Sequence, residues 1–400
     1  MKVKILPSKA CGRAFAPPSK SMAHRALICA ALGEKGRVLN IGTSRDVEVT
    51  LDCLEKMGAR VEKTKDGVII GGLDPFNIPE NTELYCHESG STLRFIIPLC
   101  MLSKHYVKIR GAERLMARPL SVYEDIAEKL GIEFYKDKSS VVVGSGLTAG
   151  EYKVSGDVSS QFITGLIFAL SCLPQESTLE VVGDFESESY VGLTLDVMSH
   201  FGRTVDRCGR TFHIKPAPFT SCDYTVEADY SSTAFLEAFN YISGEVEIEG
   251  LSESSLQGDS VYREFYPRLE KGYDTFDLSD CPDLAPVMFA LAAILNGGEF
   301  TGTARLKLKE SDRACAMREE LAKVGVYIEV FENKVIVPKM EIHAPSVPIS
   351  SHNDHRIAMA MSVILSVVGG EIEGAEAVAK SFPEFFEKLR SLGVLTEYNA

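Results

Sequence analysis

The sequence predicts an α/β protein with mixed sheets, in which one supersecondary unit of roughly 70 residues repeats six times. The main observation is a recurring junction, in which a helix-like amphipathic stretch ends at a glycine and a short alternating run follows. Glycine is favoured just past a helix C-terminus, where the chain turns through positive φ, so each junction marks a change from helix to strand. The six junction glycines are Gly58, Gly131, Gly202, Gly272, Gly325 and Gly393.

The spacing of the junctions is the second observation. Successive glycines lie 73, 71, 70, 53 and 68 residues apart. The third is that residues 67–70, 141–143 and 334–337 read as strands at hairpin distance behind three of the junctions. Helix-glycine-strand junctions also occur in any α/β protein, which is the simpler alternative, but the even spacing weighs against it.

The composition is that of an ordinary globular protein, with 45% hydrophobic and 24% charged residues among 400. This length allows two domains or more, and because no Gly/Ser-rich linker divides the chain, a boundary must fall at a plain loop. The sequence shows neither a signal-like apolar segment nor a long apolar run, so we expect no secretion and no membrane span. Ten cysteines without a CxxC pair fit free thiols in the cytoplasm.

The net charge of −14 argues against a general nucleic-acid binder, which needs a basic surface. An anionic ligand must therefore meet local positive charge. Basic residues gathered in a few short motifs would supply it, because a cleft focuses their field while the acidic exterior keeps the protein soluble.

The first such motif is the segment 16–27, where two prolines lead into serines that suit a helix N-terminus. Free backbone N–H groups at a helix N-terminus bind anions, and Lys20 and Arg25 add charge on the first turns. The segment is a candidate phosphate or carboxylate site. The alternative is a capped helix with two solvated cations.

Three further segments of the N-terminal half carry similar groups. In 88–98, Gly90 allows a ligand to approach the backbone closely, although glycine also serves ordinary turns. Arg118 and Arg114 could bind a carboxylate or phosphate; the alternative is an exposed pair in contact with solvent. The last segment offers neutral hydrogen-bonding groups at a helix start, from Ser159, Ser160 and Gln161.

The C-terminal half adds carboxylates to the cations. Asp283 precedes an apolar helix, where an ordinary N-cap is the alternative. The segment 307–313 is dense in charges and could be a solvated run. Arg356 lies at the mouth of another apolar helix, and Lys380 precedes a rigid turn.

No metal or nucleotide cofactor is implied by the motifs. His24 and His355 are far apart in sequence and lack metal-ligand spacing, so structural or hydrogen-bonding roles are expected for both. Neither GxGxxG after a strand nor GxxxxGK[ST] occurs.

Taken together, the motifs resemble those of the 5-enolpyruvylshikimate-3-phosphate synthase family of enolpyruvyl transferases, in that family's order and over nearly the whole chain. The matching segments are PSKS (18–21) with Arg25, SGSTLR (89–94), RPL (118–120), SSQF (159–162), PDLAP (282–286), KESDR (309–313) and DHRIAM (354–359). The resemblance implies two similar domains, each of three βαβαββ-type units with buried helices, like an inside-out α/β barrel. It implies a discontinuous domain of residues 1–14 plus 225–400, an inserted domain of residues 15–224, and an active site in the cleft between them.

The resemblance also implies roles for individual residues. Asp283 corresponds to the proton acceptor, Glu310 to the proton donor, and Lys20 to a further catalytic group. Shikimate 3-phosphate would bind to Lys20, Ser21, Arg25, Ser159, Ser160, Gln161, Ser187, Asp283 and Lys309. Phosphoenolpyruvate would bind to Lys20, Gly90, Arg118, Gln161, Arg313, Arg356 and Lys380.

The implied reaction needs these residue types. The 5-hydroxyl of shikimate 3-phosphate loses a proton as it attacks C2 of phosphoenolpyruvate, C3 gains a proton, and the tetrahedral adduct expels phosphate, so a base and an acid are required. Both substrates are polyanions, which calls for clustered cations arranged in advance. No metal or organic cofactor is required, and domain closure would exclude water.

The sequence departs from the family pattern in two places. His87 stands where glycine is expected, and Arg45 stands where an acid often occurs.

Rival interpretations are the enolpyruvyl transferase acting on UDP-N-acetylglucosamine, a silent anion-binding paralogue, and a purely structural repeat protein. The first typically carries a loop cysteine where Arg118 stands, the second would have lost catalytic groups, and the third leaves the cations unexplained. The resemblance favours a monomer and sensitivity to glyphosate, which Gly90 would admit.

Overall fold

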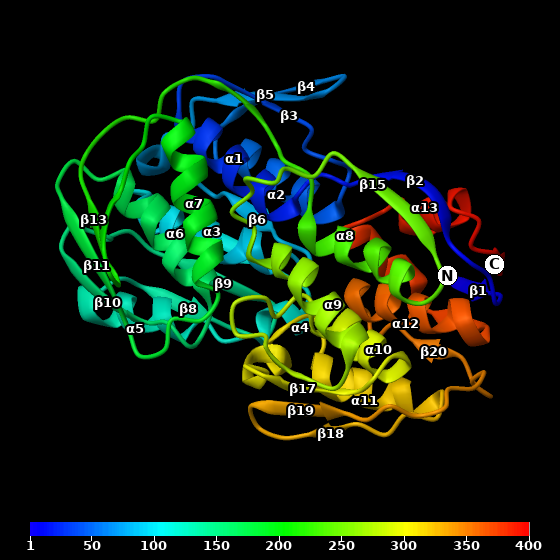
Figure 1. The fold of residues 1–400 in the computed structure, drawn as a ribbon. Helices are drawn as coiled ribbons and strands as arrows, with labels where there is room; N and C mark the ends of the chain where they lie inside the picture. The colour runs from blue at the N-terminus through cyan, green and yellow to red at the C-terminus, as the bar shows by residue number, and fades with distance from the viewer. Residues whose placement is uncertain (400) are drawn as a thin grey trace. The chain divides into compact units, whose positions relative to one another are not determined.

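The computed structural model describes residues 1–399, which form two compact units (Figure 1). One unit consists of Met1–Pro17 and the chain from Ala228 on, and we call it the discontinuous unit. The other consists of Pro18–Glu227, and we call it the inserted unit. Each has its own hydrophobic core.

These boundaries lie three residues further along the chain than the expected ones, 1–14 plus 225–400 and 15–224. Strand pairing explains the difference. Phe15 ends a strand that pairs with residues 245–249 of the discontinuous unit. Thr225 ends a strand that pairs with residues 37–39 of the inserted unit. Each residue belongs to the unit that holds its strand.

The inserted unit contains three four-stranded sheets, in the orders β14-β3-β5-β4, β6-β7-β9-β8 and β10-β11-β13-β12. In each sheet the first two strands are parallel and the others antiparallel. The strands are β3 (Gly36–Leu39), β4 (Arg60–Thr64), β5 (Gly67–Gly71), β6 (Glu83–Tyr85), β7 (Val107–Arg110), β8 (Phe134–Lys136), β9 (Ser140–Val143), β10 (Glu151–Ser155), β11 (Ser177–Val182), β12 (Asp206–Cys208), β13 (Thr211–Ile214) and β14 (Asp223–Thr225).

The helices of the inserted unit divide into an inner and an outer set. Of the inner helices, α3 and α6 contact each other, and almost every residue of both is buried because their sequences are apolar on all sides. The helices are α1 (Lys20–Leu32), α2 (Arg45–Lys56), η1 (Pro75–Asn77), α3 (Gly90–Cys100), α4 (Glu113–Met116), α5 (Ser121–Leu130), α6 (Ser160–Ser171) and α7 (Glu188–His200). Buried helices inside and sheets outside are the predicted arrangement.

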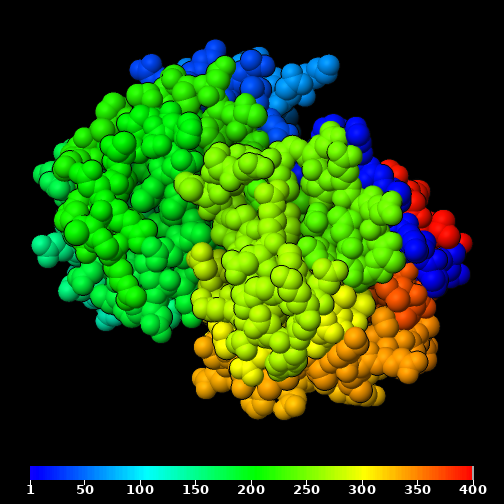
Figure 2. All heavy atoms as spheres, viewed as in Figure 1, coloured from blue at the N-terminus to red at the C-terminus, as the bar shows by residue number. Residues whose placement is uncertain are grey.

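The discontinuous unit repeats this design with two four-stranded sheets, β16-β17-β19-β18 and β20-β21-β1-β22, and one parallel pair, β15-β2. Strand β1 lies between β21 and β22, so the two ends of the chain are neighbours, as the blue and red segments show (Figure 2). The strands are β1 (Lys2–Ile5), β2 (Cys11–Phe15), β15 (Glu245–Glu249), β16 (Thr275–Asp277), β17 (Gly298–Thr301), β18 (Glu329–Val330), β19 (Lys334–Val337), β20 (Ile349–Ser350), β21 (Gly370–Glu373) and β22 (Thr396–Asn399).

Helices α10 and α12 form the buried centre of this unit and contact each other. The helices are α8 (Tyr230–Glu237), η2 (Ala238–Tyr241), η3 (Gly258–Val261), α9 (Tyr262–Lys271), α10 (Ala285–Ile294), η4 (Ala304–Leu308), α11 (Arg313–Lys323), α12 (His355–Val368), η5 (Ala375–Lys380) and α13 (Phe385–Ser391). Among the residues described, no helix combines the length and apolar character needed to cross a membrane.

All six predicted junctions lie between a helix and a strand, but the backbone of one of them differs from the expectation. Five of the glycines have positive φ, between 67° and 111°, but Gly272 has φ 168° and is extended. Gly272 still lies between a helix and a strand, but that strand, β16, belongs to the next sheet, because β2 and β15 pair alone, without the two antiparallel strands that complete each of the other five sheets. The absence of two such strands after Gly272 also explains the short spacing of 53 residues between Gly272 and Gly325.

Candidate active site

Four helices of the inserted unit begin at the segments that the sequence analysis selected. They are α1, α3, α6 and α7, which start at Lys20, Gly90, Ser160 and Glu188. Oγ of Ser89 caps α3 by accepting from the backbone N–H of Thr92, and Oγ of Ser159 caps α6 by accepting from that of Gln161. A serine at such a position satisfies N–H groups that a helix leaves unpaired, which explains why α3 and α6 begin here.

Arg25 is held by the protein on three sides. Its Nε donates to Oγ1 of Thr194 at 2.8 Å, Nη1 to the carbonyl of Ser21 at 2.7 Å, and Nη2 to the carbonyl of Tyr190 at 2.8 Å. Burial lowers the pKa of Arg25 to about 10. A guanidinium has five N–H donors, so these contacts use three of them and fix its plane.

Lys20, at the first position of α1, is paired with a carboxylate. Its Nζ lies 2.9 Å from Oδ2 of Asp46, on the first turn of α2, and both side chains are mostly buried. The adjoining Arg45 is exposed. The departure from the family pattern at Arg45 therefore falls on an exposed side chain, beside an acid that pairs with Lys20.

A second cluster surrounds Gly90. Nη1 of Arg94 donates to Oε1 of Gln161 at 2.9 Å, and Nε2 of Gln161 donates to Oγ of Ser91 at 2.9 Å. A Cβ added to Gly90 would lie 2.9 Å from Nη1 of Arg118 and 3.0 Å from Nη1 of Arg94. The structure thus brings Gly90, Arg118 and Gln161 together, whereas Arg114 is exposed.

Arg94 belongs to this cluster, although the sequence analysis left it out of the site. It is buried beneath the helix start, with its guanidinium 5.2 Å from the ring centre of Phe162. Its position one turn after Gly90 was the available signal. Ser160 and Ser187 are also buried at helix starts, and Ser187 has a left-handed backbone with φ 54°.

The backbone at His87 explains one departure from the family pattern. His87 has φ 49°, in the left-handed region that glycine adopts without cost. Its carbonyl accepts from the N–H of Ala112 at 2.6 Å, and its ring lies 4.0 Å from that of Tyr85. The turn therefore keeps the geometry that glycine would give, with contacts that compensate the strain.

The discontinuous unit holds a second set of charges, centred on Asp283. Oδ1 of Asp283 accepts from Nη1 of Arg313 at 2.7 Å and from Nζ of Lys309 at 3.3 Å. Its Oδ2 accepts from Nη2 of Arg356 at 2.7 Å. Burial alone would raise the pKa of Asp283, but Arg356, Lys309 and Arg313 together hold it well below the usual range.

Arg313 connects this carboxylate to two others. Its Nη2 donates to Oε2 of Glu310 at 2.6 Å, and its Nε donates to Oδ2 of Asp354 at 2.9 Å. Only 1% of the Arg313 side chain is exposed, and the three carboxylates raise its pKa far enough to outweigh burial. Burial lowers the pKa of Lys309, although Asp283 opposes this shift.

Asp354 is a residue that sequence reasoning missed as part of the site. Its side chain caps α12 by accepting from the backbone N–H of Arg356 at 3.0 Å, and it also accepts from Ser311. Nearby, Nζ of Lys380 donates to the carbonyl of Asn353 at 2.5 Å. The predicted residues Asp283, Lys309, Glu310, Arg313 and Arg356 thus form one network, with Lys380 beside the turn that enters α12.

A further carboxyl group lies close to this network. Asp259, in η3, is 2% exposed, and the hydroxyl of Ser231 donates to it. Burial and the charge of Asp283 raise the pKa of Asp259 to about 7, against the opposing effect of Arg356. None of the sequence motifs described above includes this residue.

The two histidines singled out from sequence are both buried. Nδ1 of His24 lies 2.7 Å from Oγ1 of Thr50, and burial holds the pKa of His24 well below its usual value. Nδ1 of His355 lies 3.8 Å from Oδ1 of Asp354.

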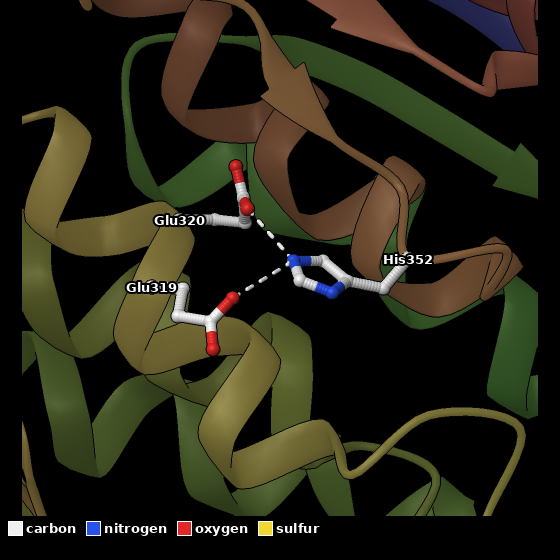
Figure 3. A group of neighbouring side chains, drawn as sticks. All are labelled: Glu319, Glu320 and His352. Carbon is white, nitrogen blue, oxygen red and sulfur yellow. Dashed lines mark hydrogen bonds and ion pairs between the residues drawn. The ribbon is translucent and has the colours of Figure 1, made fainter.

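Within residues 1–399, one group of side chains could hold a metal ion: Glu319, Glu320 and His352 (Figure 3). Nε2 of His352 points at both carboxylates, 2.7 Å from Oε1 of Glu320 and 3.7 Å from Oε2 of Glu319. However, Nζ of Lys323 already lies 2.7 Å from Oε2 of Glu320. An ammonium on a carboxylate that a cation would use disfavours a metal site.

Fold and side chains together define the class: a repeat-built α/β protein in which buried cations are held in fixed positions, several of them by carboxylates. A model of the EPSP synthase (3-phosphoshikimate 1-carboxyvinyltransferase) family matches residues 7–389. The chain belongs to this family.

Individual relatives agree with the family match. A 3-phosphoshikimate 1-carboxyvinyltransferase of Clostridium kluyveri is 38% identical over 417 aligned residues, which cover 98% of this chain and 97% of that protein. One of Clostridioides difficile is 36% identical over 425, covering 98% and 97%. A solved EPSP synthase of Acinetobacter baumannii, 22% identical, superposes with a TM-score of 0.79 over all of both chains and shares the fold.

Proposed function

We propose that this protein transfers the enolpyruvyl group of phosphoenolpyruvate to the 5-hydroxyl of shikimate 3-phosphate and releases phosphate. Membership of the EPSP synthase family supports the reaction. The observation that carries the mechanism is the bridge made by Arg313, whose two Nη atoms bind Asp283 and Glu310. A base and an acid are thereby held on either side of one cation.

In the proposed reaction Asp283 takes the proton of the 5-hydroxyl as it attacks C2, and Glu310 gives a proton to C3. In the second step C3 loses one proton, which returns to Glu310, as the C–O bond to phosphate breaks; phosphate leaves with the proton that Asp283 had taken, and the enol ether remains. Lys20 assists as a further catalytic cation. Fixed cations stabilise the charge that develops on the substrate oxygens, because they need no reorganisation during the reaction.

The binding roles follow the two clusters. We assign shikimate 3-phosphate to Lys20, Ser21, Arg25, Ser159, Ser160, Gln161, Ser187, Asp283 and Lys309. We assign phosphoenolpyruvate to Lys20, Gly90, Arg118, Gln161, Arg313, Arg356 and Lys380. Each unit carries only part of each set, so we propose that turnover requires the two units to close on the same pair of substrates.

The rival functions are disfavoured by specific residues. A silent paralogue would be expected to lack Lys20, Asp283 or Glu310, and all three are present. Transfer to UDP-N-acetylglucosamine is disfavoured by the family match and by Arg118, which packs against Gly90.

We further propose a cytoplasmic monomer, for which sedimentation with and without substrates is the test. We also propose inhibition by glyphosate; no inhibition far above the phosphoenolpyruvate requirement would contradict this.

The test of the function is phosphate release from phosphoenolpyruvate, with shikimate 3-phosphate and UDP-N-acetylglucosamine offered separately. Release with shikimate 3-phosphate alone is the expected result. Release with the sugar nucleotide alone would assign the rival activity, and binding of either acceptor without release would identify a silent paralogue.

A further inference from the structure

The turn that leads into α12 has an unusual backbone. His352 and Asn353 are consecutive non-glycine residues with φ 50° and 52°, in the left-handed region. Such residues cost free energy, so two in succession persist only where surrounding contacts hold them. We call residues 351–354 the α12 turn.

Glu320, seven residues after Arg313 on α11, supplies those contacts. Only 1% of its side chain is exposed. Its Oε2 accepts from the backbone N–H of Ser350 at 2.8 Å, and its Oε1 lies 2.7 Å from Nε2 of His352. Burial would raise the pKa of Glu320, but the bonds from His352, Lys323 and Ser350 lower it, so the carboxylate is ionised.

Lys323 extends the same anchor by one turn of α11. Its Nζ binds Oε2 of Glu320 at 2.7 Å and donates to the carbonyl of Pro348 at 3.0 Å. The chain that enters the α12 turn is therefore tied to α11 at Pro348, Ser350 and His352.

The α12 turn holds three of the candidate cations. The carbonyl of Asn353 accepts from Nζ of Lys380, and the carboxylate of Asp354 accepts from Nε of Arg313. The same carboxylate accepts from the backbone N–H of Arg356. If the turn relaxed to ordinary φ values, the carbonyl and the carboxylate would change direction, and the cations would lose their fixed acceptors.

We propose that Glu320 and His352 form a positioning pair, which holds the α12 turn and thereby aims Lys380, Arg313 and Arg356 at phosphoenolpyruvate. The inference rests on the proposed function and extends it to two residues that touch none of the reacting groups assigned above. The pair acts through the turn, so its effect falls on the affinity for phosphoenolpyruvate more than on the chemical step.

The test measures steady-state kinetics with each substrate varied in turn. For Glu320→Gln and His352→Ala, we expect the KM for phosphoenolpyruvate to rise by roughly five- to tenfold, as when one well-aimed charged contact is lost. We expect kcat to stay within about twofold and the KM for shikimate 3-phosphate to be unchanged. Glu319→Gln is the matched control, because this exposed neighbour lies 3.7 Å from His352 and contacts no turn backbone; it should behave as the unaltered protein.

Two further variants separate positioning from chemistry. His352→Gly removes the ring, but glycine adopts positive φ without strain. The affinity for phosphoenolpyruvate should therefore fall less in His352→Gly than in His352→Ala. His352→Gln keeps a donor for Glu320 and should recover part of the affinity. His352→Ala also provides a test if Glu320→Gln fails to fold, because the His352 side chain is partly exposed.

Three outcomes would overturn the proposal. The first is an unchanged KM for phosphoenolpyruvate in both Glu320→Gln and His352→Ala, and the second is a decrease in kcat alone. The third is an equal rise of the KM for phosphoenolpyruvate in His352→Ala and His352→Gly. A rise in melting temperature with Zn²⁺ or Mn²⁺ that Glu320→Gln abolishes would instead assign a metal site. Failure of the proposed function is distinguishable, because the unaltered protein would then release no phosphate with shikimate 3-phosphate.

Discussion

Nη1 of Arg313 lies 2.7 Å from Oδ1 of Asp283, so the candidate base is already paired with a buried cation before any substrate binds. This pairing keeps Asp283 ionised but lowers its affinity for a proton. A base that must accept a proton therefore has to lose part of its cationic surroundings first. Anionic substrates would provide for this, because their oxygens compete with Asp283 for the same cations.

Removing Lys309 should show this effect in the pH dependence. Its ammonium, 3.3 Å from Oδ1 of Asp283, helps to lower the pKa of that carboxyl. In Lys309→Met we expect the pKa of Asp283 to rise, so the acid side of the profile of kcat/KM against pH should move to higher pH. Lys307→Met, at an exposed position, is the control. Identical acid sides in Lys309→Met and the unaltered protein would contradict the electrostatic account.

Replacing either proton-transfer residue by its amide should lower kcat without weakening the binding of phosphoenolpyruvate. For Asp283→Asn and Glu310→Gln we expect kcat to fall by about 10²- to 10⁴-fold, the usual contribution of a general base or acid. Asp283→Asn leaves Lys309, Arg313 and Arg356 with one negative charge fewer, so phosphoenolpyruvate should bind at least as tightly, as calorimetry can measure. Weaker binding together with a small loss of kcat would mean that Asp283 is only structural.

Gly90→Ala should weaken phosphoenolpyruvate binding and leave the fold intact. The added methyl group would meet the guanidinium ends of Arg118 and Arg94 at 2.9 and 3.0 Å, and flexible side chains can yield where backbone could not. We expect the KM for phosphoenolpyruvate to rise several-fold with little change in melting temperature.

The control for this substitution is Gly192→Ala, in the middle of α7, where an added Cβ meets no atom within 4 Å. It should stabilise the protein by roughly 0.5–1 kcal/mol because alanine favours a helix interior, and should leave both KM values unchanged. If the two variants had the same KM, the proposed crowding around Gly90 would be wrong.

Asp259→Asn should make stability less sensitive to pH. The pKa of Asp259 is raised to about 7 in the folded protein by burial and by Asp283, while Arg356 opposes the shift and Asp229 adds to it. A raised folded-state pKa stabilises the fold below the unfolded-state pKa near 4, and this contribution disappears as pH rises to about 7.

The free energy of unfolding of Asp259→Asn, relative to that of the unaltered protein, should therefore be higher at pH 8 than at pH 5, by an amount on the order of a few kcal/mol. Urea unfolding at the two pH values measures it. A difference between the two proteins that stays constant with pH would show that Asp259 is not held in its neutral form.

Local sequence signals were sufficient for three of the helix starts. The serines before α3 and α6 and the aspartate before α12 are caps, and each starts a helix as their residue types predict. At Gly272 the predicted change from helix to strand is present, but the glycine is extended and not left-handed, in the one unit that lacks two antiparallel strands. Local sequence does not distinguish these two cases.

The residues that sequence reasoning missed share one property: their partners lie far away in the chain. Asp354 accepts a hydrogen bond from Arg313, which is 41 residues away in the sequence, and Arg94 donates one to Gln161, which is 67 residues away. Asp259 is influenced by Asp283 on another element. Such networks depend on how helices α3, α6, α11 and α12 pack, which spacing along one chain does not specify. The family motifs select the candidate residues because they mark several of these helix starts at once.

The most direct test of the central claim is identification of the product by mass spectrometry, alongside phosphate release, after incubation with phosphoenolpyruvate and shikimate 3-phosphate. The account predicts that the acceptor gains one enolpyruvyl group and keeps its own phosphate, with one phosphate released for each product molecule, and that Asp283→Asn forms almost none. Phosphate release without an enolpyruvyl product, or equal product from Asp283→Asn, would contradict it.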